Sequence, residues 1–427
     1  MATLTLTAKD LVLALTAREK VAGLHGDLRI PLDAVAAVRV VPDTLAAVHG
    51  LRAPGLDLPG RARIGTWWRR GGRWFVVAHR GREGLQVTLR GHRLAGLVVA
   101  LPDAGEHLRA LEAARRCRAA VSQAEVAFTS GGLRLAGTLA TPRDREPVAA
   151  ALILPGSGQV DRDADHARLP LGVSSDLAVS LAARGIASLR YDKRGVGASA
   201  GDFYAAGLSD NVDDARAALD WLRSAGSGAS RPTFVVGHSE GGIIAELVAA
   251  GDDRLDGVVL LAAPGTTGTE LMAWQGRQVA DALPPVTRAV VRLARIDLAR
   301  LQQRSIARVQ ASTADTVRMA GRRVNARWQR ELLAFDPVPA LRRITAPVLA
   351  LTGEKDLQVD PADLDVIRDT VAGPVEVHRV PDLTHLLRRD PERPNLAAYS
   401  ALVRRPTDAE VLETVGAWME QRVRATA

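Results

Sequence analysis

The residues best suited to chemistry lie in the stretch FVVGHSEGGIIAE, residues 234–246, where one serine stands among three glycines. The apolar run before it predicts a strand, and the run from Glu240 predicts a helix. Residues 237–241, GHSEG, are therefore G-x-S-x-G between a strand and a helix, the context typical of a nucleophile elbow. The flanking glycines lack Cβ atoms, so strand and helix can approach around a strained turn. We expect Ser239 Oγ at the sheet edge, beside a helix N-terminus that favours negative charge.

A serine hydroxyl needs an adjacent base to become a good nucleophile near neutral pH. For a serine on such an elbow, the expected chain order is serine, then acid, then histidine. Two histidines follow Ser239, namely His378 and His385. His378 lies inside the predicted strand VEVHRV, which commits its side chain to one sheet face and indicates a structural role. His385 lies in the following loop, PDLTHLL, where an imidazole can reach the serine, and we predict it to be the general base.

Three carboxylates could supply the acid, because APVLALTGEKDLQVDP, the strand and loop before VEVHRV, carries Glu354, Asp356 and Asp360. Glu354 is close to the strand end. Asp360 precedes Pro361 and is typical of a helix N-cap with proline in the first turn. We predict that Asp356 accepts a hydrogen bond from the histidine ring and stabilises the imidazolium.

Two backbone amides are expected to hold the oxyanion. One is the N–H of Glu240, directly after the serine. The other should come from residues 156–163, GSGQVDRD, and Ser157 is the predicted donor. These groups predict acyl transfer, in which the serine attacks an ester or thioester carbonyl and water releases the acid. No metal or organic cofactor is required, and epoxide hydrolase or dehalogenase chemistry is disfavoured because the elbow residue is serine rather than aspartate.

The elements that position these residues begin near residue 124. A hairpin pattern is followed by apolar strands that alternate with helices, which predicts a mostly parallel sheet covered on both faces. Ligands bind at the carboxyl ends of the strands in such sheets. Between about residues 265 and 335 the alternation gives way to an arginine-rich helical pattern, such as RAVVRLARIDLARLQQRSIARVQ. We expect this insertion to form a helical cap.

Residues 124–427 resemble an α/β-hydrolase with a helical cap. LPGSGQVDRD, RYDKRGVGAS, GHSEGG, TGEKD and the late TH are similar, in order and spacing, to the esterase and dienelactone-hydrolase-like bacterial branch. The resemblance implies a serine esterase that cleaves carboxylic esters of small molecules through Ser239, Asp356 and His385. Gln159 departs from the proline that relatives often have, which affects the loop and not the triad.

Other substrates remain alternatives within the same fold. An acyl-CoA thioesterase, a lactone hydrolase and a small peptidase share the same chemistry. The arginine-rich cap fits an anionic leaving group such as coenzyme A. In RYDKRG, Asp192 and Arg194 are interpreted as a structural turn and ion pair.

Residues 1–120 show another pattern, about seven short strands followed by a helix from Asp103 to Ala120. With the phrase IPLDAVAAVRVV, this order resembles the bacterial pleckstrin-homology-like fold, a bent barrel closed by a terminal helix, over roughly residues 1–118. An unrelated β-rich domain is the alternative. The resemblance implies a lipid headgroup or a peptide as partner, so a binding or scaffold protein is the second class of function.

Composition excludes several partners. Net charge is +8, but only four of the 56 basic residues are lysine, and the arginines are dispersed without aromatic residues between them, so no nucleic acid is expected. The single Cys117 permits no intramolecular disulfide, and the nine histidines lack metal-binding spacing. The sequence has no apolar stretch of transmembrane length and no signal-peptide pattern, so a cytoplasmic protein is expected.

Overall fold

The computed structural model describes residues 1–7, 9–166, 169–224, 231–281, 293, 298–319 and 321–426. They form two compact units. One holds residues 1–119 and the short segment 404–406, and the other holds residues 120–403 and 407–427. Within the described ranges, no helix combines the length and apolar character needed to cross a bilayer.

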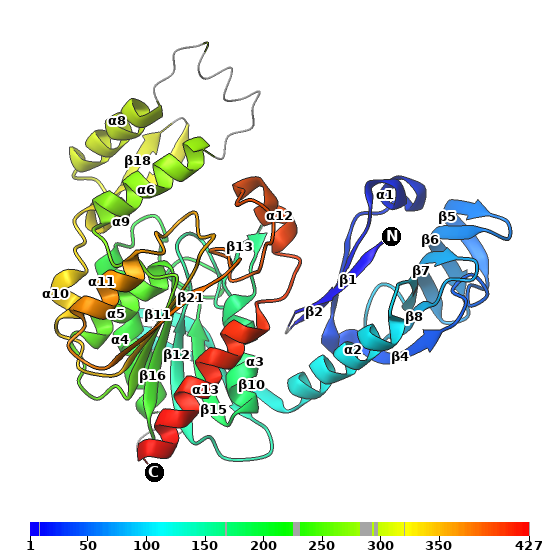
Figure 1. The fold of residues 1–427 in the computed structure, drawn as a ribbon, viewed down its shortest axis with the longest axis horizontal. Helices are drawn as coiled ribbons and strands as arrows, with labels where there is room; N and C mark the ends of the chain where they lie inside the picture. The colour runs from blue at the N-terminus through cyan, green and yellow to red at the C-terminus, as the bar shows by residue number, and fades with distance from the viewer. Residues whose placement is uncertain are drawn as a thin grey trace. The chain divides into compact units, whose positions relative to one another are not determined.

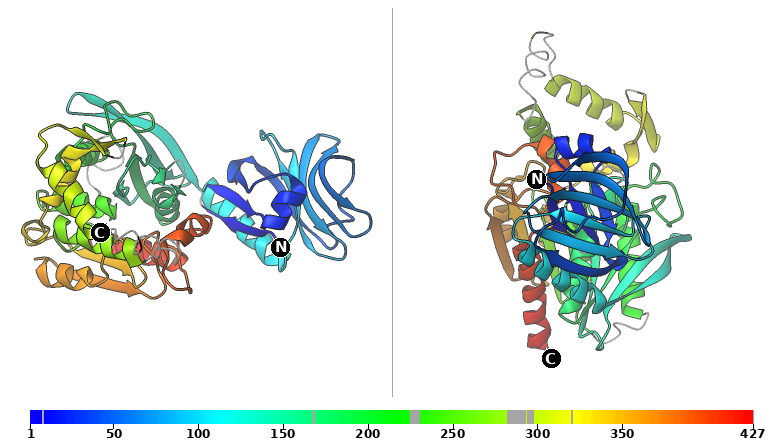
Figure 2. Two further views of the ribbon diagram at one scale, coloured as in Figure 1. Left: turned by 90° about the horizontal axis from the view of Figure 1, so that it is seen from above. Right: turned by 90° about the vertical axis from the view of Figure 1, so that its right-hand side faces the viewer.

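The N-terminal unit contains two sheets and two α-helices (Figure 1, Figure 2). Its elements are β1 (Thr3–Leu6), β2 (Asp10–Ala14), α1 (Ala17–Gly23), β3 (Leu28–Pro31), η1 (Leu32–Ala34), β4 (Val35–Val41), β5 (Leu51–Leu58), β6 (Ala62–Arg69), β7 (Gly72–His79), β8 (Gly84–Leu89), β9 (Gly96–Ala100) and α2 (Ala104–Ala119). Strands β1–β3 form one sheet, and the other has the order β4-β8-β9-β7-β6-β5, in which β7 and β9 are parallel. The unit therefore has nine strands where about seven are predicted, and α1 and β5 are additional elements.

One core joins the two sheets of this unit to helix α2. Leu111 of α2 is fully buried and belongs to the same cluster as Leu11 and Ile30 of the first sheet and Phe75 and Leu97 of the second. The predicted C-terminal helix is thus present and covers the sheets. The pleckstrin-homology-like identity of this unit stays a prediction.

The second unit is built on an eight-stranded sheet of order β10-β11-β15-β12-β16-β17-β20-β21. Its strands are β10 (Val121–Ser130), β11 (Leu133–Pro142), β12 (Ala149–Leu154), β15 (Ile186–Tyr191), β16 (Thr233–His238), β17 (Gly257–Leu261), β20 (Val348–Gly353) and β21 (Val375–Val380). The strands from β15 to β21 in this order are parallel, and β10–β11 is an antiparallel hairpin at the edge. The predicted fold class is confirmed.

Helices cover both faces of this sheet (Figure 1). They are α3 (Val173–Ala183) and α13 (Ala409–Thr426) on one face, with α4 (Leu208–Ser224), α5 (Glu240–Ala249), α10 (Val338–Leu341) and α11 (Asp363–Thr370) on the other. Short elements complete the unit: β13 (Asp165–His166), β14 (Leu169–Pro170), η2 (Leu396–Ala398) and α12 (Tyr399–Leu402). Because β12, β16, β17 and β20 are buried along their whole length, they are mostly apolar and do not alternate between apolar and polar residues.

The insertion between β17 and β20 contains α6 (Gly268–Asp281), α8 (Leu298–Gln310), β18 (Thr316–Met319), β19 (Arg322–Asn325) and α9 (Ala326–Leu333). The insertion contains the predicted helices and, in addition, β18–β19, an antiparallel hairpin that the helical pattern did not indicate. Gly321 adopts a φ of 77° directly before β19, a conformation that suits a tight turn and not a helix. The predicted helical pattern at 282–292 and 294–297 lies outside the described residues.

Candidate active site

The turn between β16 and α5 has the geometry expected of the glycine-flanked serine. Ser239 adopts φ 57° and ψ −119°, a strained conformation for a residue with a side chain. A Cβ on Gly237 would lie 2.1 Å from the Gly241 carbonyl oxygen, and one on Gly241 would lie 2.2 Å from that of Leu154. Only glycine fits at either position, so the turn depends on both.

Ser239, His385 and Asp356 lie in one hydrogen-bonded row at the carboxyl edge of the sheet. His385 Nε2 is 3.0 Å from Ser239 Oγ, and His385 Nδ1 is 2.8 Å from Asp356 Oδ2. The His385 and Asp356 side chains are 5% and 0% exposed, so water competes little for the bond between them. The three residues follow β16, β20 and β21, parallel strands whose carboxyl ends share one edge.

The loop after β20 separates the three candidate carboxylates. Asp356 is buried, and its Oδ1 accepts backbone N–H bonds from Gln358 at 2.7 Å and Val359 at 2.9 Å. Glu354 is exposed, and Asp360 accepts a bond from a backbone amide two residues further on. Of the three candidate carboxylates, Asp356 is therefore the one that bonds to the His385 imidazole.

Two further histidines near these strands, His378 and His238, do not contact the serine hydroxyl in the described structure. His378 is on β21, is 40% exposed and bonds to Glu376 at 2.7 Å, away from the serine. His238 is buried beside the serine, and its Nε2–H donates to the His385 carbonyl at 2.9 Å. Burial lowers the pKa of His238 to about 3, so its imidazole stays neutral and supports the loop that carries His385.

A buried lysine fixes the loop that carries the predicted second oxyanion donor. Lys193 Nζ donates to the Gly156 carbonyl at 2.7 Å, and a Cβ on Gly156 would lie 3.4 Å from Ser239 Cβ. The carbonyl of Gly156 and the N–H of Ser157 belong to one planar trans peptide and point in opposite directions. By holding the carbonyl, Lys193 fixes the direction of the Ser157 N–H beside the nucleophile.

The same lysine meets the side chain of Glu240, the residue after the serine. Glu240 Oε2 is 3.1 Å from Lys193 Nζ, while Oε1 accepts bonds from Asn211 Nδ2 and Trp328 Nε1, both at 3.0 Å. Glu240 and Lys193 are both buried, which makes their pairing necessary. Sequence reasoning missed these side-chain roles, although opposite charges beside the two motifs were a readable signal.

The interpretation of Asp192 and Arg194 as an ion pair with each other is wrong. Asp192 accepts a bidentate pair and a backbone N–H bond from Arg162, which lies in the same loop as Ser157. Arg194 instead pairs with Asp210 and Asp214. Both residues do belong to the scaffold, and Asp192 fixes the loop that carries Ser157.

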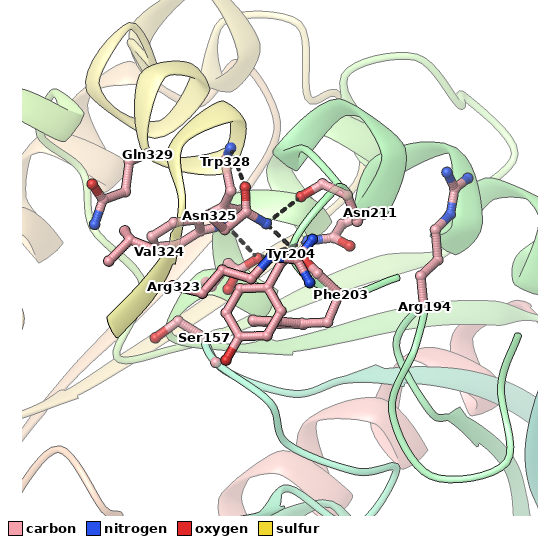
Figure 3. A pocket seen from close by; sticks show the side chains of 13 residues that line it. Ser157, Arg194, Phe203, Tyr204, Asn211, Arg323, Val324, Asn325, Trp328 and Gln329 are labelled. Atoms are coloured by element: carbon pink, nitrogen blue, oxygen red, sulfur yellow. Dashed lines mark hydrogen bonds between the residues drawn. The ribbon is translucent and has the colours of Figure 1, made fainter. Parts of the chain in front are cut away.

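Two cavities meet at Ser157. The first, of about 200 Å³, is lined by Ser239 and His385 and is called the histidine-side cavity; its other lining residues include Val160, His166, Leu169, Leu171, Gln358 and Leu386. The second, of about 310 Å³, is called the aromatic cavity and is lined by Phe203, Tyr204, Ala206, Glu240, Val324 and Trp328, among others (Figure 3). Ser157 lines both.

Two buried acidic residues, Glu246 on α5 and Asp363 on α11, interact electrostatically. Glu246 of α5 is fully buried, and neither of its carboxylate oxygens has a hydrogen-bond partner among the described residues. Burial, with a smaller contribution from Asp363, raises the pKa of Glu246 well above its usual range, and burial raises the pKa of Asp363 to about 7. Folding therefore shifts both groups toward the protonated form.

We expect Glu246→Gln to make thermal stability less sensitive to alkaline pH. In the wild type, the unfolded chain releases the Glu246 proton above pH 4.5 while the folded chain retains it, so this group destabilises the fold as pH rises. The difference in Tm between variant and wild type should therefore increase from about pH 5 to about pH 9. The exposed Glu354→Gln is the control and should show no such trend; a pH-independent difference for Glu246→Gln would contradict the raised pKa.

Comparison with known proteins agrees with this architecture. Residues 170–392 match the family described as Hydrolase_4, serine aminopeptidase S33. Esterase EstD of Thermotoga maritima is 24% identical over 297 residues, which are 67% of this chain and 65% of that protein, so the chain spans less than two thirds of that relative's length.

Among solved structures, proline iminopeptidase of Mycobacterium smegmatis matches with a TM-score of 0.50 and 17% identity, over 71% of this chain and 100% of that one. Est1E of Butyrivibrio proteoclasticus with bound ferulic acid matches with a TM-score of 0.47 and 18% identity, over 70% of this chain and 99% of that one. At such identities the likeness to the iminopeptidase concerns the fold. Since the family match covers more than half of the chain, the chain belongs to the Hydrolase_4, serine aminopeptidase S33, family of α/β-hydrolases.

Proposed function

We propose that this protein is a serine hydrolase that cleaves carboxylic esters through a Ser239–His385–Asp356 triad. The observation that carries the proposal is the pair of hydrogen bonds on the His385 ring, one to Ser239 Oγ at 3.0 Å and one to Asp356 at 2.8 Å. We assign the activity to a domain at residues 124–427, with its cap at about 265–335, separate from a domain at residues 1–120.

The reaction follows from the positions of these groups. His385 Nε2 takes the Ser239 proton as Oγ attacks the ester carbonyl, while Asp356 accepts the Nδ1–H bond and stabilises the imidazolium. The N–H groups of Ser157 and Glu240 hold the oxyanion. The imidazolium gives its proton to the departing alcohol, and water activated by His385 then releases the acid.

The lining of the two cavities favours an ester over a peptide with a free N-terminus. A substrate ammonium group needs a carboxylate partner, and Glu240 is the only acidic residue among the described residues that line them. Its two oxygens already accept bonds from Lys193, Asn211 and Trp328. No carboxylate of the lining is therefore left to bind the ammonium.

The test is kcat/KM of the purified protein on p-nitrophenyl acetate and butyrate, on acyl-CoAs and on aminoacyl p-nitroanilides. We expect the esters to be preferred. Preference for the acyl-CoAs would indicate the thioesterase alternative, preference for the anilides an aminopeptidase, and failure on all three classes would refute hydrolysis by this triad.

Replacing Lys193 with methionine should lower kcat for the p-nitrophenyl esters by about 10²–10³-fold, the range associated with one oxyanion donor, with little change in KM. The reason is the loss of the bond that orients the peptide between Gly156 and Ser157. Steady-state kinetics at matched Tm measure the effect.

Lys193→Met also leaves the Glu240 carboxylate without its cation, so Lys193→Met combined with Glu240→Gln is the matched control. We expect kcat of the double variant to remain low, because the Gly156 carbonyl still lacks the hydrogen bond from Lys193. Recovery of kcat in the double variant would attribute the defect to an unpaired buried charge and not to the peptide orientation.

A further inference from the structure

The two cavities have different relations to the reacting groups. The histidine-side cavity is lined by both His385 and Ser239, whereas the described lining of the aromatic cavity contains neither and includes Ser157 and Glu240. An ester carbonyl at Ser239 has two substituents that diverge from its carbon, the acyl group and the alcohol. The two described cavities that share Ser157 offer one space for each substituent.

Proton transfer decides which substituent goes where. The departing alcohol oxygen must lie within hydrogen-bond reach of His385 Nε2, which supplies its proton. The alcohol therefore occupies the histidine-side cavity. The carbonyl oxygen points to the amides of Ser157 and Glu240, and the acyl group continues past these two residues into the aromatic cavity.

The walls of the aromatic cavity indicate what kind of acyl group fits. Phe203 and Tyr204 meet edge to face with ring centroids 5.4 Å apart, and Trp328 and Val324 of the cap stand among the lining side chains (Figure 3). Aromatic side chains bind flat apolar groups through stacked and edge-to-face contacts. The volume of about 310 Å³ is within the range of small-molecule sites.

Several polar side chains of this cavity are already engaged in bonds with protein groups. Asn325 Nδ2 donates to the Phe203 and Ala206 carbonyls, and its Oδ1 accepts the Trp328 N–H. Arg323 pairs with Asp202 and lies over the Tyr204 ring at 4.7 Å. An acyl group with its own charge would have to displace such pairs, whereas an uncharged one would not.

The arginine side chains that line the cavity are therefore not arranged as in a site that binds an anion. Arg194, which also lines it, is only 13% exposed at its side chain and is held by Asp210 and Asp214. Two carboxylates around one guanidinium leave no net positive charge for a substrate carboxylate.

We propose that the aromatic cavity binds the acyl group and selects a bulky, uncharged acyl group that carries an aromatic ring, while the smaller histidine-side cavity takes a short aliphatic alcohol. This assignment depends on the proposed esterase function and adds to it a substrate class and a direction of binding. Phe203, Val324 and Trp328 are then specificity-determining residues.

A pair of esters with exchanged halves tests the direction. Ethyl 3-phenylpropanoate has an aromatic acyl group and a short alcohol, whereas 3-phenylpropyl acetate has the reverse, and hydrolysis of both can be followed by acid release in a pH-stat. We expect kcat/KM to be about ten-fold or more higher for the phenylpropanoate. Equal values, or a preference for the acetate, would overturn the assignment.

Two variants of the cavity sharpen the test. Phe203→Ala removes a wall and should lower kcat/KM for ethyl and methyl 3-phenylpropanoate alike, by about ten-fold or more, while ethyl acetate is little affected. Val324→Phe should fill the cavity and produce the same selective loss. Leu169→Ala, in the histidine-side cavity, is the matched control and should change the ranking of alcohols without changing that of acyl groups.

The outcomes separate this proposal from the function on which it depends. An enzyme that cleaves ethyl acetate but shows no acyl selectivity, or in which Leu169→Ala and not Phe203→Ala alters that selectivity, keeps the proposed esterase function and overturns the cavity assignment. A wild-type protein that cleaves no ester at all overturns both.

Discussion

Ser239→Ala should lower kcat/KM for p-nitrophenyl esters by on the order of 10⁵-fold or more, leaving only the residual rate that binding and the oxyanion donors support. The expected loss is this large because the hydroxyl is the nucleophile of the covalent step and no neighbouring group can replace it. Fold and stability should change little, since the hydrogen bond to His385 is the one that Ser239 Oγ makes within the described residues of the turn. Steady-state kinetics on the purified variant measure the effect.

Ser157→Ala is the matched control for this experiment. It removes a hydroxyl from the opposite side of the same site but keeps the backbone N–H to which the oxyanion role is assigned, so activity should remain within a few-fold of wild type. Labelling with a fluorophosphonate should occur in the wild type and in Ser157→Ala and be absent in Ser239→Ala. An unlabelled wild type would favour the alternative that the chain is a binding or scaffold protein.

Asp356→Asn should lower kcat by about 10⁴-fold, the cost measured when a triad carboxylate becomes an amide and the histidine adopts the wrong tautomer. In this protein the carboxylate is held in place by the Gln358 and Val359 amides, which bond to Oδ1 and leave Oδ2 for His385. An asparagine can keep the first two bonds, so the fold should survive while the ring loses its acceptor.

Asp360→Asn is the control for Asp356→Asn, because it makes the same change four residues further along the same loop. Its carboxylate bonds to the Ala362 amide and does not reach the imidazole. We expect kcat to remain near the wild-type value. Comparable losses in the two variants would indicate that loop order, and not the partner of His385, controls activity.

The sheet of the second unit could be predicted from sequence because its signals are local. Each central strand is a short, mostly apolar run bounded by turn residues, and the helices between them have a 3.6-residue period. Position on the sheet then followed from strand direction, since residues after β16, β20 and β21 must share one edge. Because Ser239, Asp356 and His385 each follow one of these strands, the sequence already predicted that they lie close together.

The features that could not be predicted are those set by weak or distant signals. Helix α1 was not among the predicted elements, although Thr16 and Glu19 have the T-x-x-E spacing of a capping box and do form one. The pairing of Asp192 with Arg162 instead of Arg194 joins residues 30 positions apart. Such partners depend on loop geometry, about which periodicity gives no information. The predicted division into domains at about residue 120 and the identity of the first of them stay predictions.

Trp328 of the cap contributes directly to the turn that carries the nucleophile, because its indole is one of three donors to Glu240, the residue after Ser239. The cap is consequently not an interchangeable module. A chimera with the cap of a relative that lacks an equivalent donor would lose one of the two hydrogen bonds to Glu240 Oε1, one residue from the nucleophile. Engineering of substrate range by cap exchange should therefore retain this tryptophan.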